Sequence, residues 1–384
     1  MNYLELAELF TEKNLQGRYI ALQHIQPLLE QKSFKNGLSI LGSSVQNRPI
    51  YCYKIGTGSK KILLWSQMHG DESTTTKALF DFFNFLDSNH SLAILFKKEV
   101  SFCFVPMLNP DGAFAYTREN ANLVDLNRDA VDLSQPESVI LRALYLDFQP
   151  DFCFNLHDQR SIYGAGNSGK SAIVSFLAPA YNTNREINDC RNTAINVIIA
   201  VHKTLLDHID GNIGRFDDTF NANCVGDTFQ SLGTPTILFE AGHFANDYNR
   251  DFSRKLIFAG YLSAFKCISE NDIVSKDIVD YLLIPQNKAN FYDLIYNNVK
   301  IYDDGIEKMI NFAVQYTEVL VDNEIVFFGY IAAINNLENC FGHNSIDCCQ
   351  KKYSDSINNY PEIDTIANFS LNDEFIFKNG LKCD

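Results

Sequence analysis

Residues 60–86 read KKILLWSQMHGDESTTTKALFDFFNFL and contain a strand, a turn and a helix in succession. The apolar run at the start of this stretch predicts a buried strand that ends near Ser66. From Ser73 to Leu86 the apolar residues recur at helical spacing, and Ser73 with the threonines after it are candidate helix caps. A strand followed by a helix is the unit from which helix-covered parallel sheets are built.

The same alternation continues on both sides of this stretch. The apolar patterns predict two more strands between residues 37 and 60, strands at 100–105, 152–156, 172–177 and 235–240, and helices at 136–148, 186–209 and 249–268. We therefore expect an α/β fold with a mixed, mostly parallel sheet covered by helices.

After Asn271 the helical periodicity fades. The runs near 290–335 look like strands and show little helical periodicity. These patterns predict three segments: a helical N-terminal segment (1–36), an α/β domain (37–275) and a small β-rich C-terminal appendage (285–384).

Composition restricts the classes of partner. The 384 residues are 46% hydrophobic and 21% charged, and the formal net charge is −15. So acidic a surface argues against nucleic acid and anionic membrane surfaces as partners. No apolar run approaches the ~20 residues that span a bilayer, and the N-terminus does not resemble a signal peptide. The ten cysteines form no C-x-x-C pair, so we expect reduced thiols and a cytoplasmic protein.

Three residues form a candidate metal site. His69 and Glu72 lie one helical turn apart directly after a predicted strand, and His157 ends another. The carboxyl ends of parallel strands meet at one edge of a sheet, where ligands bind. Two histidines and one glutamate leave an open position on zinc, which is typical of a catalytic site. Taken alone, these residues also fit a packed histidine and a structural carboxylate.

The candidate site belongs to a longer ordered series of motifs. In chain order these are G-x-S-x-x-x-R-x-I at 42–50, H-x-x-E at 69–72, N-P-D-G at 109–112, Arg118, D-L-N-R at 125–128, His157 and F-E-A-G at 239–242. With this series the sequence resembles the carboxypeptidase A-like zinc carboxypeptidases over about residues 37–265.

The resemblance implies the metal site and the catalytic base. His69, Glu72 and His157 would bind one Zn²⁺ per chain, and this His₂Glu set is the one known for that family rather than a result of the spacing. Glu240 would act as general acid/base, taking a proton from the zinc-activated water and returning it to the leaving amine.

The remaining motif residues imply roles around the substrate. Arg118 would stabilise the oxyanion, and Asn127 with Arg128 would bind the free carboxylate of the substrate, for which a planar guanidinium is well matched. Asp125 would orient the first zinc histidine by holding its second ring nitrogen.

The sequence departs from the family in two places. The stretch GRFDDTFNANCVGD (214–227) has no counterpart of the mobile tyrosine that family peptidases carry before the catalytic glutamate, and Tyr163 and Tyr248 are candidate replacements. The interval between Arg118 and Asn127 is short, and a β-rich appendage follows. Both features resemble the aspartoacylase and succinylglutamate desuccinylase branch, which cleaves N-acyl amino acids.

Three functions therefore stay open: a cytoplasmic zinc-dependent metallocarboxypeptidase, a zinc-dependent N-acyl amino acid deacylase, and an inactive module that binds carboxylate-terminated ligands. The complete zinc and glutamate set argues against the third. In the first two, the substrate is a peptide or acyl amino acid with a free carboxylate.

Two further features lie outside the motif series. Residues 164–171 satisfy the phosphate-loop pattern G-x-x-x-x-G-K-S, but the sequence after them predicts a strand where that motif needs a helix, so we expect a Gly/Ser loop instead. Arg215, Asp217 and Asp218 lie in a polar loop and are candidates to shape the substrate pocket.

Overall fold

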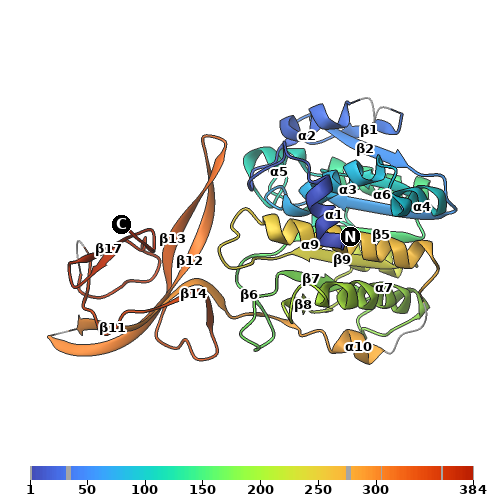
Figure 1. Ribbon diagram of the computed structural model, residues 1–384. Coiled ribbons are helices and arrows are strands. Elements are labelled where there is room, and N and C mark those ends of the chain that lie inside the picture. Colours follow the sequence, from blue (N-terminus) through green and yellow to red (C-terminus); the bar gives the residue numbers. More distant parts are fainter. Residues whose placement is uncertain (1, 32–35, 274–277, 304, 356–357, 384) are drawn as a thin grey trace.

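The computed structural model describes residues 2–31, 36–273, 278–303, 305–355 and 358–383. An α/β part and a β-rich part lie side by side (Figure 1). The helices are α1 (Tyr3–Phe10), α2 (Leu22–Leu29), α3 (Thr74–Leu86), α4 (Ser91–Glu99), α5 (Pro110–Ala115), the 3₁₀ helix η1 (Leu126–Arg128), α6 (Pro136–Phe148), α7 (Asp189–Leu206), α8 (Val225–Ser231), α9 (Asp251–Ser269) and α10 (Ile278–Leu282).

The strands of the α/β part are β1 (Leu38–Ser43), β2 (Pro49–Ile55), β3 (Lys60–Ser66), β4 (Val100–Val105), β5 (Phe152–Asp158), β6 (Tyr163–Ala165), β7 (Val174–Leu177), β8 (Ile213–Arg215) and β9 (Thr236–Ala241). Those that follow are β10 (Asn287–Ala289), β11 (Phe291–Asp303), β12 (Ile306–Val321), β13 (Glu324–Ile334), β14 (Phe341–Asp347), β15 (Tyr353–Ser354), β16 (Phe369–Leu371), β17 (Phe375–Lys378) and β18 (Leu381–Lys382).

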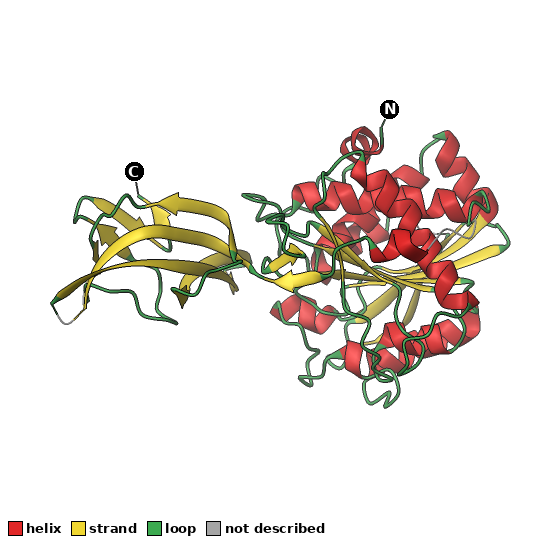
Figure 2. Cartoon of the chain, turned by 90° about the horizontal axis from the view of Figure 1, so that it is seen from below, coloured by secondary structure: helices red, strands yellow, loops and turns green. Residues whose placement is uncertain are grey.

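The α/β part is built on one eight-stranded sheet with the order β1-β2-β4-β3-β5-β9-β7-β8. The pairs β3–β4, β3–β5, β5–β9 and β7–β8 are parallel, and the other three neighbouring pairs are antiparallel. Helices cover both faces of this sheet (Figure 2). The predicted fold class, a mixed and mostly parallel sheet covered by helices with a β-rich appendage, is confirmed.

Strand β3 shows why the sheet is buried on both faces. Ile62 and Leu64 belong to the core shared with α3, α7 and α9, whereas Leu63 and Trp65 belong to the core shared with α6 and α8. Because successive side chains of a strand point to opposite faces, a strand between two helix layers must be apolar throughout.

Phe82 lies at the centre of the larger core and allows a test of it. Its ring is fully buried, and its centroid is 5.1 Å from that of Phe265 and 5.8 Å from that of Phe102. We expect Phe82→Ala to lower the free energy of unfolding by ~3–5 kcal/mol, because the substitution leaves a cavity that the packed rings cannot fill. Denaturant titration measures this change. The matched control is Leu146→Ala on α6, whose side chain is 61% exposed; equal losses in the two variants would contradict this account of the core.

The start of α3 differs in one respect from the prediction. Ser73 is the residue before the helix, but its side chain caps no helix N–H and its hydroxyl donates to the carbonyl of Arg18. Instead, the carboxylate of Asp158 on β5 accepts from the amides of Thr74 (3.0 Å) and Thr75 (3.3 Å). A distant strand therefore supplies the anionic cap that the local sequence lacks.

The N-terminal helices pack on the α/β part. Leu6 of α1 and Leu29 of α2 are buried in the same core as the sheet, and the guanidinium of Arg254 on α9 donates to the carbonyls of Leu15 and Glu12. The limits of the three segments (1–36, 37–275 and 285–384) stay a prediction.

Several short elements were not expected from the sequence, α4 and η1 among them. The polar loop before β9 contains β8 and α8, and the N-P-D-G turn is the first turn of α5. In α5, Asn109 caps the helix by accepting from the amide of Gly112 (2.8 Å), and Pro110 occupies the first helical position. Asparagine and proline are common both in turns and at helix starts, so composition alone does not separate the two.

The phosphate-loop-like stretch forms a β-turn region rather than a nucleotide cradle. Residues 163–165 form β6, which pairs with β10, and Lys170 donates to Asp210. The predicted strand that follows is confirmed as β7, and the next helix among the described residues begins only at Asp189.

The β-rich part has its own core and two four-stranded sheets, ordered β13-β12-β11-β14 and β15-β16-β17-β18. In that core Tyr296 stacks on Phe312, and Phe369 packs edge-on against both rings. The strands predicted near 290–335 are confirmed as β11 to β13. All ten cysteines are free, and among the described residues no helix combines the length and apolarity needed to cross a bilayer.

Candidate active site

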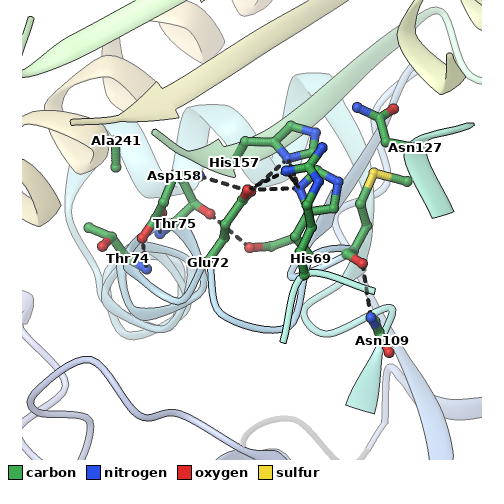
Figure 3. Close-up of polar contacts among 12 residues, drawn as sticks. His69, Glu72, Thr74, Thr75, Asn109, Asn127, His157, Asp158 and Ala241 are labelled. Atoms are coloured by element: carbon green, nitrogen blue, oxygen red, sulfur yellow. Dashed lines mark hydrogen bonds and ion pairs between the residues drawn. The ribbon is translucent and has the colours of Figure 1, made fainter. Parts of the chain in front are cut away.

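Two adjacent strands bring the predicted metal ligands together. His69 and Glu72 lie in the turn between β3 and α3, and His157 is near the end of β5, which pairs with β3 in parallel. His69 Nδ1 is 2.7 Å from Glu72 Oε1 and 3.1 Å from His157 Nδ1, and His157 Nδ1 is 2.8 Å from Glu72 Oε2. All three residues are buried, and Figure 3 shows their side chains converging on one point.

The chemistry of this donor set fits zinc. Tetrahedral zinc with bonds of ~2.0–2.1 Å places its donors ~3.3 Å apart. The two histidine nitrogens are 3.1 Å apart, and the histidine–carboxylate pairs, at 2.7 and 2.8 Å, would have to open by about half an ångström. Burial raises the pKa of Glu72, but the two histidines outweigh it and hold that pKa well below its usual range, so the carboxylate is ionised. Burial lowers the pKa of His157, which favours the neutral imidazole that binds metals.

The carboxylate of Asp125 contacts the second ring nitrogen of His69. Its Oδ1 is 3.1 Å from His69 Nε2, which leaves Nδ1 of that ring directed at Glu72. Burial alone would lower the pKa of His69, but the carboxylates of Glu72 and Asp125 outweigh it and raise that pKa to about 9. This contact therefore constrains the orientation of the His69 ring.

We expect Asp125→Asn to weaken zinc binding by ~10–100-fold, because the amide keeps the size of the side chain but not its charge. Competition with a chromophoric chelator measures this affinity. Asp147→Asn, at an exposed position of α6, is the control with the same change of charge. Equal zinc affinity in the two variants would exclude the orienting role of Asp125.

Arg118 lies over the ligand cluster. Its Nε and Nη2 donate to Asp125 Oδ2 at 3.1 and 3.0 Å, and its Nη1 is 3.3 Å from Glu72 Oε1. The side chain is 41% exposed, so the guanidinium contacts both the candidate metal ligands and the open cleft.

Glu240 faces the cleft from the neighbouring strand. It is the register partner of His157 in the β5–β9 pair. Burial, together with the nearby carboxylates of Glu72 and Asp158, raises its pKa well above the usual range. No hydrogen bond or ion pair of its carboxylate is found among the described residues, so its oxygens are available to a bound molecule.

A cavity of about 340 Å³ contains most of the predicted site. Asn127 and Arg128 line it together with the candidate zinc ligands, Arg118 and Glu240, whereas Asp125 lies behind His69. Asn127 Oδ1 accepts from the amide of Val225 at 3.2 Å, and Arg128 donates to the carbonyl of Asn127 at 2.7 Å. Figure 3 shows Asn127 to one side of the three ligands.

Of the two tyrosines considered as replacements for the family phenol, only Tyr163 lines this cavity. Its ring packs edge-on against Phe216. Tyr248 is not among the lining residues, and its hydroxyl donates to Asp293 at 3.1 Å. Tyr163 is therefore the better placed of the two.

The polar loop contributes one of its three candidate residues to the pocket. Asp217 lines the cavity. The guanidinium of Arg215 lies over the ring of Tyr281, and Asp218 pairs with Arg191 at 2.5 Å. Arg215 and Asp218 therefore make contacts outside this cavity.

Several residues of the cleft were not predicted. Asp158, Gln159 and Arg160 follow His157 directly, and their position at the end of a sheet strand is the signal that would have found them. They line both the first cavity and a second one of about 300 Å³. The two cavities also share Glu72 and Arg118 as walls, and the second reaches β12 of the β-rich part.

Other motif residues connect the turns that hold the site. Asp111 of N-P-D-G accepts from the hydroxyl of Ser44 (2.8 Å) and from Arg48 (2.5 Å), both in the first motif. A side chain at Gly70 would collide with the backbone of Gly112 at 1.9 Å. The H-G-D-E turn can thus approach the N-P-D-G helix only with glycine at that position.

Comparison with known proteins agrees with this geometry. Residues 22–156 match the family model of the zinc carboxypeptidases. A probable carboxypeptidase 2 of Trichophyton verrucosum is 27% identical over 123 residues, which are 32% of this chain and 22% of that protein. The chain thus spans about a fifth of the length of this curated relative.

Solved structures share the fold at low identity. A metallo-carboxypeptidase from Burkholderia cenocepacia aligns with a TM-score of 0.51 and 16% identity, over 65% of this chain and 67% of that one. A metallo-carboxypeptidase from Pseudomonas aeruginosa, in complex with (2-guanidinoethylmercapto)succinic acid, aligns with a TM-score of 0.51 and 15% identity, over 65% and 70%. Over residues 22–156 in sequence and over the α/β part in fold, the chain is therefore similar to the zinc carboxypeptidases, as its ordered motifs predicted.

Proposed function

We propose that the protein is a zinc-dependent metallocarboxypeptidase that hydrolyses a C-terminal peptide bond. The observation that carries this proposal is the convergence of His69, Glu72 and His157 on one point of a cavity that Glu240 and Arg128 also line. The match of residues 22–156 to the zinc carboxypeptidases supports the same chemistry.

His69, Glu72 and His157 would hold the ion. Zinc bound there would act as a Lewis acid, polarising the scissile carbonyl and lowering the pKa of water to ~7. Glu240 would take the proton of the attacking water and deliver it to the amine as the C–N bond breaks. Its raised pKa suits the first step, since a carboxylate with little affinity for protons would be a poor base for the water.

The arginines would position the substrate and stabilise charge. Arg128 and the amide of Asn127, which both line the cavity, would bind the terminal carboxylate. Arg118 would donate to the carbonyl oxygen as negative charge develops on it, an interaction stronger in the transition state than in the ground state.

The second cavity favours a peptide over a single acylated amino acid. It adjoins the first at Glu72 and Arg118 and extends to Tyr316 and Glu318 of β12. A peptide has residues on both sides of its scissile bond and would occupy both spaces, whereas a short acyl group would leave the second largely unfilled.

A substrate panel tests this preference. We expect blocked dipeptides and tripeptides to be cleaved at their C-terminal bond with kcat/KM at least ~10-fold above that of N-acetyl amino acids, as ~1.4 kcal/mol of extra transition-state binding would produce. Peptides with a C-terminal amide are the control, since they lack the carboxylate for Arg128. Cleavage of acylated single amino acids without cleavage of longer peptides would instead favour the deacylase.

A further inference from the structure

A second group of histidine and aspartate side chains lies where the two parts of the protein meet. His243 follows β9 of the α/β part, whereas Asp293 on β11 and His343 on β14 belong to the β-rich part. One potential ligand atom of each residue lies within 4.8 Å of those of the other two. None of the three lines the cavity that holds Glu240.

Asp293 is a buried carboxylate without a compensating cation. Its side chain is 0% exposed, and it accepts from the amide of Tyr316 (2.7 Å), the hydroxyls of Tyr248 (3.1 Å) and Ser161 (3.3 Å), and the amide of Gln315. All of these donors are neutral, and no ion pair of Asp293 is found within the described ranges. Buried carboxylates are normally paired with a cation or bound to a metal.

Both histidines have the protonation that metal binding requires. Burial lowers the pKa of His243 to about 2 and that of His343 to about 4, so both rings are neutral. His343 Nε2 is 2.8 Å from the carbonyl oxygen of Ser161 and must therefore donate to it. A histidine that donates one ring N–H to a carbonyl keeps the lone pair of the other nitrogen for a metal.

His243 has a buried ring nitrogen that makes no hydrogen bond to any described residue. The residue is 3% exposed, and in the part of the chain that the structure describes its Nε2 has no hydrogen-bond partner. Its ring centroid is 4.5 Å from that of His343. A purely structural cluster would pair this nitrogen, because an unpartnered buried polar atom costs ~1–3 kcal/mol.

We propose that His243, Asp293 and His343 bind a second divalent transition-metal ion, for which zinc is the best match. Two imidazoles and one carboxylate are donors that zinc prefers, and three protein ligands leave its fourth position to water. The ion would neutralise Asp293 and link the end of β9 to β11 and β14. The full chain would then hold two zinc ions rather than the one that the family resemblance implies.

The metal content of wild type and four variants tests this site. After dialysis against zinc and then against metal-free buffer, elemental analysis should give about two zinc ions per wild-type chain, one for His343→Ala, one for Glu72→Ala and none for the double variant. His208→Ala, which removes a histidine outside both clusters, is the matched control and should keep two.

Glu72→Ala tests whether the second zinc site exists even if His343→Ala fails to fold. Glu72 contacts none of the three second-site residues, so its loss leaves that site intact. This variant should keep one zinc ion, and zinc added after chelation should raise its Tm. A Glu72→Ala chain without zinc and without that rise would overturn the second site. Failure of the His69 site would look different, since wild type would then hold one ion that His343→Ala removes.

Discussion

Glu240→Gln is expected to lower kcat by ~10²–10⁴ without changing the zinc content. Glutamine has nearly the shape of glutamate but cannot accept a proton from water at neutral pH. Glu240 lies beside His157 in the strand register and faces the cavity, while the proposed zinc ligands are other residues. The substitution therefore removes the proposed base and leaves the metal site intact.

Steady-state kinetics on a blocked dipeptide, together with elemental analysis and Tm, measure this effect. Glu99→Gln is the matched control, because it makes the same change at a surface residue whose only described ion pair is with Lys98. Turnover by Glu240→Gln at the rate of Glu99→Gln would refute Glu240 as the base. It would also reopen the question of which group delivers the proton to the leaving amine.

The same variant bears on the third function considered from the sequence, an inactive binding module. A binding module has no need of an ionisable group at position 240, so its affinity for a carboxylate ligand would be equal in wild type and Glu240→Gln, and neither would show turnover. A measurable loss of turnover in this variant is incompatible with that function.

Much of the fold could be predicted because periodicity marks buried elements clearly. The strand at 100–105 and the helix at 136–148 have the predicted bounds, since each is a short apolar pattern ended by a proline, a polar turn or both. The elements within residues 210–234 could not be found in this way. Strand β8 has three residues and α8 seven, so neither is long enough to show a period against a polar background.

The candidate site was predictable to the extent that each residue sits in a local motif. His157 could be placed because it ends an apolar strand, and strand order brings it to His69. The cap on α3 could not, because Asp158 reaches Thr74 from a strand 84 positions away. The cluster of His243, Asp293 and His343 was missed for the same reason: each is an isolated residue in sequence, and only the docking of the β-rich part brings them together.

Glu72→Ala is expected to remove one zinc ion per chain and with it all measurable hydrolysis. The Glu72 carboxylate bridges the two histidines, with one oxygen 2.7 Å from His69 Nδ1 and the other 2.8 Å from His157 Nδ1. Loss of an outer partner of a zinc ligand costs ~10–100-fold in affinity, and loss of a ligand itself should cost far more. Elemental analysis and dipeptide hydrolysis measure the two effects, with Glu99→Ala as the surface control.

The comparison between the two glutamate variants separates binding from catalysis. If Glu72 and Glu240 act as proposed, both variants are inactive, but only Glu72→Ala loses zinc. A Glu72→Ala chain that keeps the full wild-type zinc content would show that His69 and His157 are packed residues. The pairing of β3 with β5 alone would then explain why these two rings lie close together, and no metal would be needed.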